Sequence, residues 1–323
     1  MAAKKKTIKS EVEEVTKGGA LLGHAIGYVD IDVPTPPTNE EIEKLIEADG
    51  RDEGVIDFGK MGYIEFSRKP DFIYNRLASV DGYNGFGIKY RKDWEIEMAL
   101  KTLHDLGAAH PNANILGVGA GTERTIFELA NAQSSALVTP TDIYLDAGVW
   151  DGWHGKKFLE NPSSFAPDGL RFDPKRIIPM HADMTNLPFD DEGYDAVFSS
   201  GSIEHVGKSG IADWGAISKA AKEIGRVLKK GGITSISTEF KVSGEGWGFG
   251  HVRLFSKEDI LKYIVEPSGL ELVGEVDWSY HGDLNDYAEL ADAVNNPKAE
   301  ENKPLLRHDG FLFTSIHLAL TKR

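Results

Sequence analysis

The 323-residue chain contains no cysteine. Disulfide bonds, cysteine-ligated zinc sites and a thiolate nucleophile are therefore excluded, and a reducing, cytoplasmic setting is expected. The ten histidines do not follow the spacing of metal-ligand sets, so we expect no metal site. No apolar run approaches the roughly 20 residues of a membrane-spanning helix, which predicts a soluble protein with no membrane partner.

Positive charge is also scarce. The chain has 36 lysine and arginine residues against 51 aspartate and glutamate residues, a formal net charge of −15. Such a surface repels phosphate backbones, so we expect no nucleic-acid partner. The one basic cluster, residues 4–9, is not followed by an apolar segment. We interpret it as part of a disordered end of about ten residues, because a signal peptide would need that apolar segment.

A glycine-rich turn is the most informative feature that is present. Residues 114–118 form a short apolar run that predicts a buried strand, and glycines follow at positions 117, 119 and 121. An amphipathic helix with Ile126 and Leu129 on one face should come next. A strand, a glycine turn and a helix together let backbone N–H groups approach a nucleotide-like ligand. This pattern alone is weak, because many glycine turns bind nothing.

Strand and helix patterns alternate after this turn, which predicts a parallel sheet with crossover helices. One predicted helix covers residues 213–230 and ends at a glycine pair at 231–232, and another is capped by Ser256. Further strands are predicted over residues 136–139, 176–181, 194–199, 233–238, 270–276 and 311–320.

The first 110 residues are predicted to be an N-terminal extension, and residues 111–323 the main domain. Within the extension, a capping box predicts a helix near residues 39–48. A second helix is predicted over residues 93–106, with Asp93 as its cap and Gly107 as its stop.

Polar side chains follow the predicted strands at the edge where ligands bind in open α/β sheets. Asp142 ends the second strand about twenty residues after the glycines, a spacing that suits a ribose diol, although it could also cap a helix. This arrangement fits either a dinucleotide or an adenosyl ligand. Arg124 stands where the dinucleotide fingerprint needs a glycine, so a pyrophosphate cradle is incomplete.

Three segments in order resemble the class I S-adenosylmethionine-dependent methyltransferases, in particular their small-molecule group of the methyltransferase type 11 kind. They are the glycine turn, the run 181–206 and the run 226–232. The resemblance covers about residues 112–322. It implies a Rossmann-like, mostly parallel sheet of seven strands with an antiparallel last strand and helices on both faces. It also implies S-adenosylmethionine as the cofactor.

The resemblance further implies roles for single residues. Gly117, Gly119, Ala120 and Gly121 would pass beneath the methionine part and the ribose of the cofactor, and Asp142 would hold the ribose hydroxyls. The remaining implied contacts are those of Ile143 with the adenine, Asp183 and Met184 with the adenine amino group, and Ser199 and Ser200 near the sulfonium.

The sequence departs from the family pattern at two positions. The family usually has an acid where Gly117 stands and a glycine where Glu123 stands. Our hypothesis is that Glu123 supplies the carboxylate that engages the methionine ammonium group. A glutamate in the first turn of a helix also suits the helix dipole without any ligand.

The methyl acceptor is expected to be a small molecule methylated on oxygen or nitrogen, and the sequence does not indicate the oligomeric state. His205 is the best-placed general base, with Glu204 beside it, although both could instead serve packing or loop capping. Alternatives are an NAD(P)-binding oxidoreductase and a non-catalytic methyltransferase-like scaffold. A cyclopropane fatty acid synthase-like enzyme ranks low, because those enzymes carry an active-site cysteine.

Overall fold

The computed structural model describes residues 90–131, 136–146, 154–208, 211–243 and 252–323. The predicted disordered end and the helix near residues 39–48 lie outside these residues. The division into two parts at residue 110 stays a prediction.

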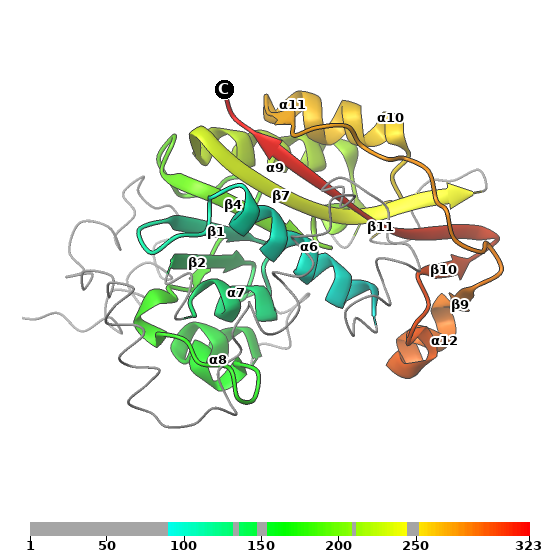
Figure 1. Ribbon diagram of the computed structural model, residues 1–323, viewed down its shortest axis with the longest axis horizontal. Helices are drawn as coiled ribbons and strands as arrows, with labels where there is room; N and C mark the ends of the chain where they lie inside the picture. Colours follow the sequence, from blue (N-terminus) through cyan, green and yellow to red (C-terminus); the bar gives the residue numbers. More distant parts are fainter. Residues whose placement is uncertain (1–89, 132–135, 147–153, 209–210, 244–251) are drawn as a thin grey trace, which may run out of the picture.

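A central sheet organises the described part of the chain (Figure 1). Its strand order is β3-β2-β1-β4-β7-β11-β10-β9, with β8 also paired to β11. β1 to β4 and β7 pair in parallel, and β11 runs antiparallel to β7. The bounds are β1 Asn114–Val118, β2 Leu137–Asp142, β3 Met180–His181, β4 Tyr194–Ser200, β7 Leu228–Ser243, β8 Glu271–Leu272, β9 Tyr287–Glu289, β10 Leu305–His308 and β11 Phe311–Thr321.

This order confirms the predicted fold class. The seven strands expected from the sequence are present, and the last of them, β11, is antiparallel to its neighbour β7. β9 and β10 extend the sheet beyond β11, and a short separate ladder joins β5 Gly207–Lys208 to β6 Ile211–Ala212.

Helices cover both faces of the sheet. On one face α9 packs through Ile217, Ala221 and Ile224, together with α10 and the π-helical turn that follows it. On the other face lie α6, α7 and α8. The bounds are α6 Arg91–Asp105, α7 Arg124–Leu129, α8 His154–Glu160, α9 Trp214–Val227, α10 Lys257–Ile260, the π-helical turn Leu261–Val265, α11 Glu266–Ser268 and α12 Leu290–Asn295. Four short 3-10 turns are η1 Pro162–Phe165, η2 Pro174–Arg176, η3 Ile203–His205 and η5 Pro297–Glu300.

The helix predicted over residues 93–106 is α6, but its predicted cap is wrong. The helix begins at Arg91, and Asp93 is its third residue. The Asp93 carboxylate reaches back and accepts a hydrogen bond from the Tyr90 backbone N–H at 3.2 Å. An acid at the third position of a helix often accepts a hydrogen bond from the backbone N–H of the capping residue. The acid that the sequence offered as a cap therefore lies inside the first turn of the helix. Gly107 follows the helix with φ of +72°, as a stop residue should.

The predicted end of the 213–230 helix is also wrong. Asp213 caps α9 as expected, accepting from Ala216 N–H at 2.9 Å, but the helix ends at Val227 and β7 begins at Leu228. The strand runs through the glycine pair, and Gly231 adopts φ of +78° while its N–H donates to the Lys322 carbonyl. Leu228 is buried in the core as the first residue of β7. This burial, rather than the glycine pair at 231–232, determines where the helix ends.

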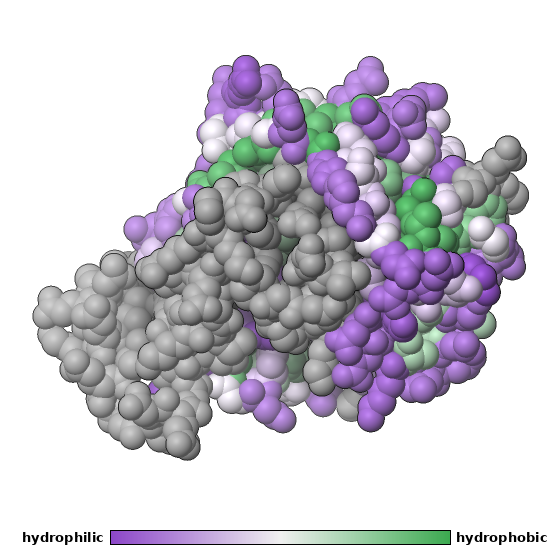
Figure 2. Space-filling view, turned by 45° about the vertical axis from the view of Figure 1, so that its right-hand side comes forward, coloured by the Kyte–Doolittle hydropathy of each residue, from purple (hydrophilic) through white to green (hydrophobic). Residues whose placement is uncertain are grey.

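Other strands are shorter than predicted. The 176–181 strand is reduced to β3, because residues 174–176 form a 3-10 turn and Pro179 has no N–H to donate to a ladder. The 270–276 strand is reduced to β8. The described surface in Figure 2 is mostly hydrophilic, and none of the helices among the described residues is long and apolar enough to cross a membrane.

Candidate functional site

The glycine turn after β1 lies against the loops that follow β3 and β4. Gly119 has φ of +61° and Gly121 has φ of +51°, a conformation that other residues rarely adopt. A Cβ at Gly119 would lie 2.5 Å from Ser202 Oγ and 2.7 Å from Met184 Cε. Ser202 Oγ in turn lies 2.9 Å from Ser199 Oγ. The structure therefore brings the predicted residues of three strand ends together at the turn.

Asp142 at the end of β2 is tied directly to the glycine turn. One carboxylate oxygen accepts from Gly121 N–H at 3.0 Å, and the other accepts from Ile143 N–H at 2.7 Å. The buried Tyr144 hydroxyl donates to the Gly121 carbonyl at 2.5 Å. The segment at the end of β2 thus holds the glycine turn through both Asp142 and Tyr144. The residues after Asp142 form a turn rather than a helix up to residue 146, so Asp142 does not act there as a helix cap.

Asp183 lies further along this edge of the sheet. Its side chain is exposed and accepts from Thr185 N–H at 2.8 Å, which fixes the turn after β3. The next residue, Met184, is half-buried and faces the glycine turn, as its distance from the Gly119 position shows.

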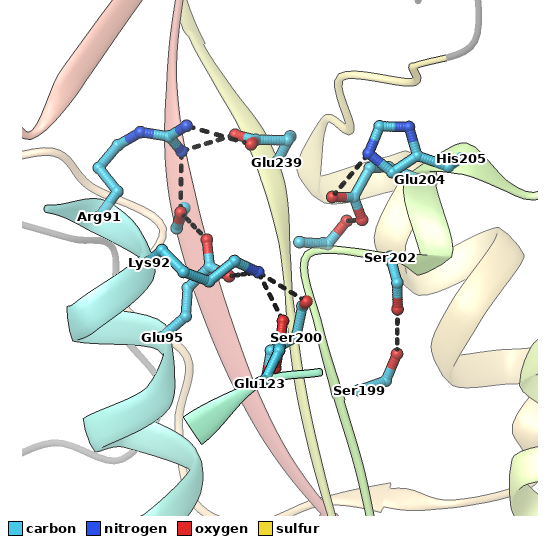
Figure 3. Close-up of polar contacts among 12 residues, drawn as sticks. Arg91, Lys92, Glu95, Glu123, Ser199, Ser200, Ser202, Glu204, His205 and Glu239 are labelled. Carbon is cyan, nitrogen blue, oxygen red and sulfur yellow. Dashed lines mark hydrogen bonds and ion pairs between the residues drawn. The ribbon is translucent and has the colours of Figure 1, made fainter. Parts of the chain in front are cut away.

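Glu123 is the residue before α7, but its side chain does not cap that helix. Its Oε1 lies 3.0 Å from Lys92 Nζ on α6, and Lys92 also donates to the Ser200 carbonyl at 2.8 Å (Figure 3). Glu123 Oε2 is buried and has no hydrogen-bond partner among the described residues. Burial raises the pKa of Glu123 to about 7, even though the Lys92 charge acts in the opposite direction.

A second pair of charges lies beside the first. The Arg91 guanidinium donates to both oxygens of Glu239 on β7, at 2.8 and 3.2 Å, and to Ser315 Oγ on β11 at 2.9 Å. Ser315 in turn donates to Glu95, which also accepts from Lys92 at 3.0 Å. The first two turns of α6 are therefore fixed to the sheet by a buried polar network.

Glu204 and His205 lie in η3, just after β4. The Glu204 side chain is 1% exposed, and its Oε2 accepts from Thr238 Oγ1 on β7 at 2.9 Å. Its Oε1 lies 3.8 Å from Nε2 of His205, whose side chain is 44% exposed. Burial, followed by the nearby Glu239 charge, raises the pKa of Glu204 to about 8.

We refer to Glu95, Glu123, Glu204 and Glu239 as the carboxylate cluster. Figure 3 shows these side chains around the ends of β4 and β7, with the two cations of α6 between them. The sequence predicted Glu123 and Glu204, but it gave no signal for Arg91, Lys92, Glu95 or Glu239. Among the residues that the structure describes, no group of three or more histidine and acidic side chains could hold a metal ion.

Comparison with known families agrees with this geometry. Residues 116–236 match the family model described as a methyltransferase domain. The matched segment runs from β1 into β7 and includes the glycine turn, Asp142 and Glu204. The resemblance to class I methyltransferases of the type 11 kind is thus confirmed for this segment. No curated protein matches the chain.

Solved structures with similar folds share little sequence with this chain. The [4+2]-cyclase SpnF is 15% identical over 90% of this chain and 97% of its own, with a TM-score of 0.46. Geranyl diphosphate C-methyltransferase from Streptomyces coelicolor A3(2), solved with Mg²⁺, geranyl diphosphate and S-adenosyl-L-homocysteine, is 14% identical over 71% and 80%, with a TM-score of 0.44. The YcgJ protein from Bacillus subtilis is 13% identical over 69% and 97%, with a TM-score of 0.41.

Proposed function

We propose that this protein is an S-adenosylmethionine-dependent methyltransferase that methylates oxygen or nitrogen of a small molecule. The observation that carries the proposal is the pairing of Asp142 with the glycine turn, next to a buried carboxylate oxygen of Glu123 that has no partner among the described residues. Each of these groups matches a separate part of the cofactor.

The residues at the strand ends fit that cofactor chemically. A carboxylate has about four acceptor positions, so Asp142 can accept two backbone N–H groups and two ribose hydroxyls at once. Glu123 Oε2 suits an ammonium group, and the half-exposed Lys92 beside it suits a carboxylate, so the pair complements the amino-acid end of the cofactor. The positive-φ glycines leave room for a ligand to approach the backbone closely.

The cofactor would supply a methyl group activated by the positive sulfur. The protein's own task is to hold the acceptor close and aligned, and to accept its proton. His205 is suited to the second task, because its ring is partly exposed at the edge of the cluster while Glu204 lies buried beneath it. A neutral imidazole can accept the proton of a hydroxyl or an ammonium group near neutral pH.

A nicotinamide-dependent oxidoreductase is disfavoured by the charges at the start of α7. A dinucleotide would place its pyrophosphate at this helix terminus. Glu123 presents a carboxylate there instead, which repels phosphate, and the Arg124 guanidinium is paired with Glu128 of the same helix at 2.6 Å. Neither Glu123 nor Arg124 lets a pyrophosphate approach the backbone as closely as a glycine would.

Calorimetric titration with S-adenosylmethionine, S-adenosylhomocysteine and NADH tests the proposal. We expect the first two to bind and NADH not to bind. The Asp142→Asn variant should bind both adenosyl ligands more weakly, and the exposed Asp168→Asn variant should bind them as the unaltered protein does. Binding of NADH alone would contradict the proposal. Binding of none of the three would favour a non-catalytic scaffold.

A further inference from the structure

Four carboxyl groups surround the end of β4, but among the described residues only two lysine or arginine side chains pair with them. Glu95 and Glu123 share Lys92, and Glu239 pairs with Arg91. The described residues provide no lysine or arginine ion pair to Glu204. The cluster therefore has more carboxyl groups than lysine and arginine partners among the described residues, and Glu204 is its member without such a partner.

The groups that face Glu204 come from two elements besides its own turn and from the loop at Arg253. Thr238 and Glu239 face it from β7, and Glu95 and Lys92 face it from α6. Arg253 donates its backbone N–H to the Glu204 carbonyl, while its guanidinium lies 5.5 Å from the centre of the Trp214 ring. His205, in the same turn as Glu204, lies 3.8 Å from it and is 44% exposed, whereas Glu204 is 1% exposed.

The backbone at Gly201 makes this convergence possible. Gly201 has φ of +60°, and a Cβ there would lie 2.7 Å from Lys92 Nζ, 2.9 Å from Glu95 Oε2 and 3.6 Å from Glu204 Oε1. Three ionisable groups from two elements thus meet within one side chain's volume, immediately after Ser200.

Two buried hydroxyl groups beside the cluster have hydrogen-bonding capacity that the described residues leave unused. Ser200 and Ser237 are opposite each other on β4 and β7, and their side chains are almost fully buried. The Oγ atoms of both residues have no hydrogen-bond partner among the described residues. Strand alternation places Ser237 on the same face as Glu239, towards α6. Buried polar atoms without partners are rare, and an absent ligand is one cause of them.

We propose that Glu204 holds a proton while the cofactor site is empty, releases it when the positively charged cofactor binds, and recovers a proton when methyl transfer removes that charge. The proposal rests on the proposed function, because the charge in question is that of the sulfonium. It assigns to the carboxylate cluster the task of distinguishing the charged methyl donor from its neutral product.

The proton balance of the reaction supports this role. When a hydroxyl or ammonium acceptor is methylated, the carbon–sulfur bond breaks and leaves its electron pair on sulfur, a bond from carbon to the acceptor atom forms, and the acceptor loses one proton. One positive charge disappears from sulfur while one proton appears beside it. A carboxyl group that takes up this proton, by way of His205, keeps the charge of the closed site constant.

The state of Glu204 without ligand agrees with the proposal. With its pKa near 8, the carboxyl is about nine-tenths protonated at pH 7. A positive charge within about 4–6 Å lowers the pKa of a carboxyl by about 1–3 units. A shift of that size moves the pKa of Glu204 to about 5–7, so binding at pH 7 should release about 0.4–0.9 of a proton.

Calorimetric titration at pH 7 in two buffers of different ionisation enthalpy measures the protons released on binding. We expect S-adenosylmethionine to release about 0.4–0.9 of a proton more than S-adenosylhomocysteine. Any proton from Glu123 cancels in this difference, because both ligands carry the same ammonium group. The Glu204→Gln variant should bind S-adenosylhomocysteine normally, and the difference should fall to near zero.

The possible outcomes distinguish a failure of this inference from a failure of the methyltransferase proposal on which it rests. Equal proton release by the two ligands, or an unchanged difference in Glu204→Gln, would overturn the inference and leave the methyltransferase proposal standing. If neither ligand binds the unaltered protein, both the inference on Glu204 and the methyltransferase proposal fail. Should Glu204→Gln not fold, Glu239→Gln serves as the second variant. Removal of that neighbouring charge should move the proton-release difference to lower pH, and an unmoved profile would overturn the inference.

Discussion

Replacing Glu123 by glutamine tests the proposed contact between this residue and the amino-acid end of S-adenosylmethionine. The substitution keeps the shape of the side chain and removes its charge. In the structure Glu123 has one oxygen on Lys92 at 3.0 Å and one buried oxygen without a partner among the described residues. Lys92 keeps Glu95 and the Ser200 carbonyl as partners in the variant, so the substitution should leave α6 in place.

The expected loss follows from the kind of hydrogen bond that is removed. A hydrogen bond to a charged group contributes about 1.5–3 kcal/mol. Loss of such a bond to the ligand ammonium should weaken S-adenosylhomocysteine binding by about 10- to 150-fold. The neutral product is the ligand of choice, because it carries the ammonium group but no sulfonium.

The pH dependence gives a second, independent signature. Only the ionised carboxylate attracts the ammonium group, and burial raises the pKa of Glu123 to about 7. Affinity should therefore be constant well above pH 7 and fall as the pH drops below it, to about one-tenth at pH 6. In Glu123→Gln the affinity should be low and nearly independent of pH between 6 and 8.

Glu97→Gln is the matched control for this experiment. Glu97 also has its pKa raised to about 7 by burial, but its charged neighbours are Arg124, Glu128 and Asp93 rather than the cluster around Ser200. Its substitution should leave both the affinity and the pH profile as they are. The reasoning would be refuted if Glu123→Gln bound the ligand within threefold of the unaltered protein, or if the unaltered protein showed no change between pH 6 and 8.

Three further substitutions test other parts of the account. Asp142→Ala should weaken S-adenosylmethionine binding by about 1–3 kcal/mol, measured by calorimetry, and undiminished affinity would argue against the ribose contact. Gly119→Ala and Gly169→Ala both place a side chain at positive φ, but only the side chain at position 119 meets neighbouring atoms. Thermal unfolding should show a lower melting temperature in both variants, and only Gly119→Ala should lose ligand affinity. Ile217→Ala, in the fully buried stripe of α9, should lower the free energy of unfolding in urea by about 2–5 kcal/mol, whereas the exposed Lys219→Ala should change it by less than about 0.5 kcal/mol.

Local patterns predicted the parts of the site that neighbouring residues determine. The glycine turn, its flanking strand and Asp142 lie within about thirty residues of one another, and together they favoured a dinucleotide or an adenosyl ligand. The mostly parallel sheet with an antiparallel last strand followed from the alternation of strands and helices together with the family resemblance. These features need no knowledge of distant contacts.

The charged half of the site could not be predicted in this way. Arg91 and Glu239 are 148 residues apart and meet only because α6 packs over β7. Nothing in the local pattern around Lys92 distinguishes it from a solvated helix residue. A distant contact also explains why the predicted end of the 213–230 helix is wrong. Leu228 pairs with Tyr194 of β4, so the strand begins before the glycine pair.

A crystal structure of the protein with S-adenosylhomocysteine tests the central claim most directly. The account predicts the ligand at the carboxyl ends of β1, β2 and β4, with its ribose hydroxyls on the Asp142 carboxylate and its ammonium group on Glu123 Oε2. A ligand bound elsewhere, or a ribose that does not contact Asp142, would contradict it.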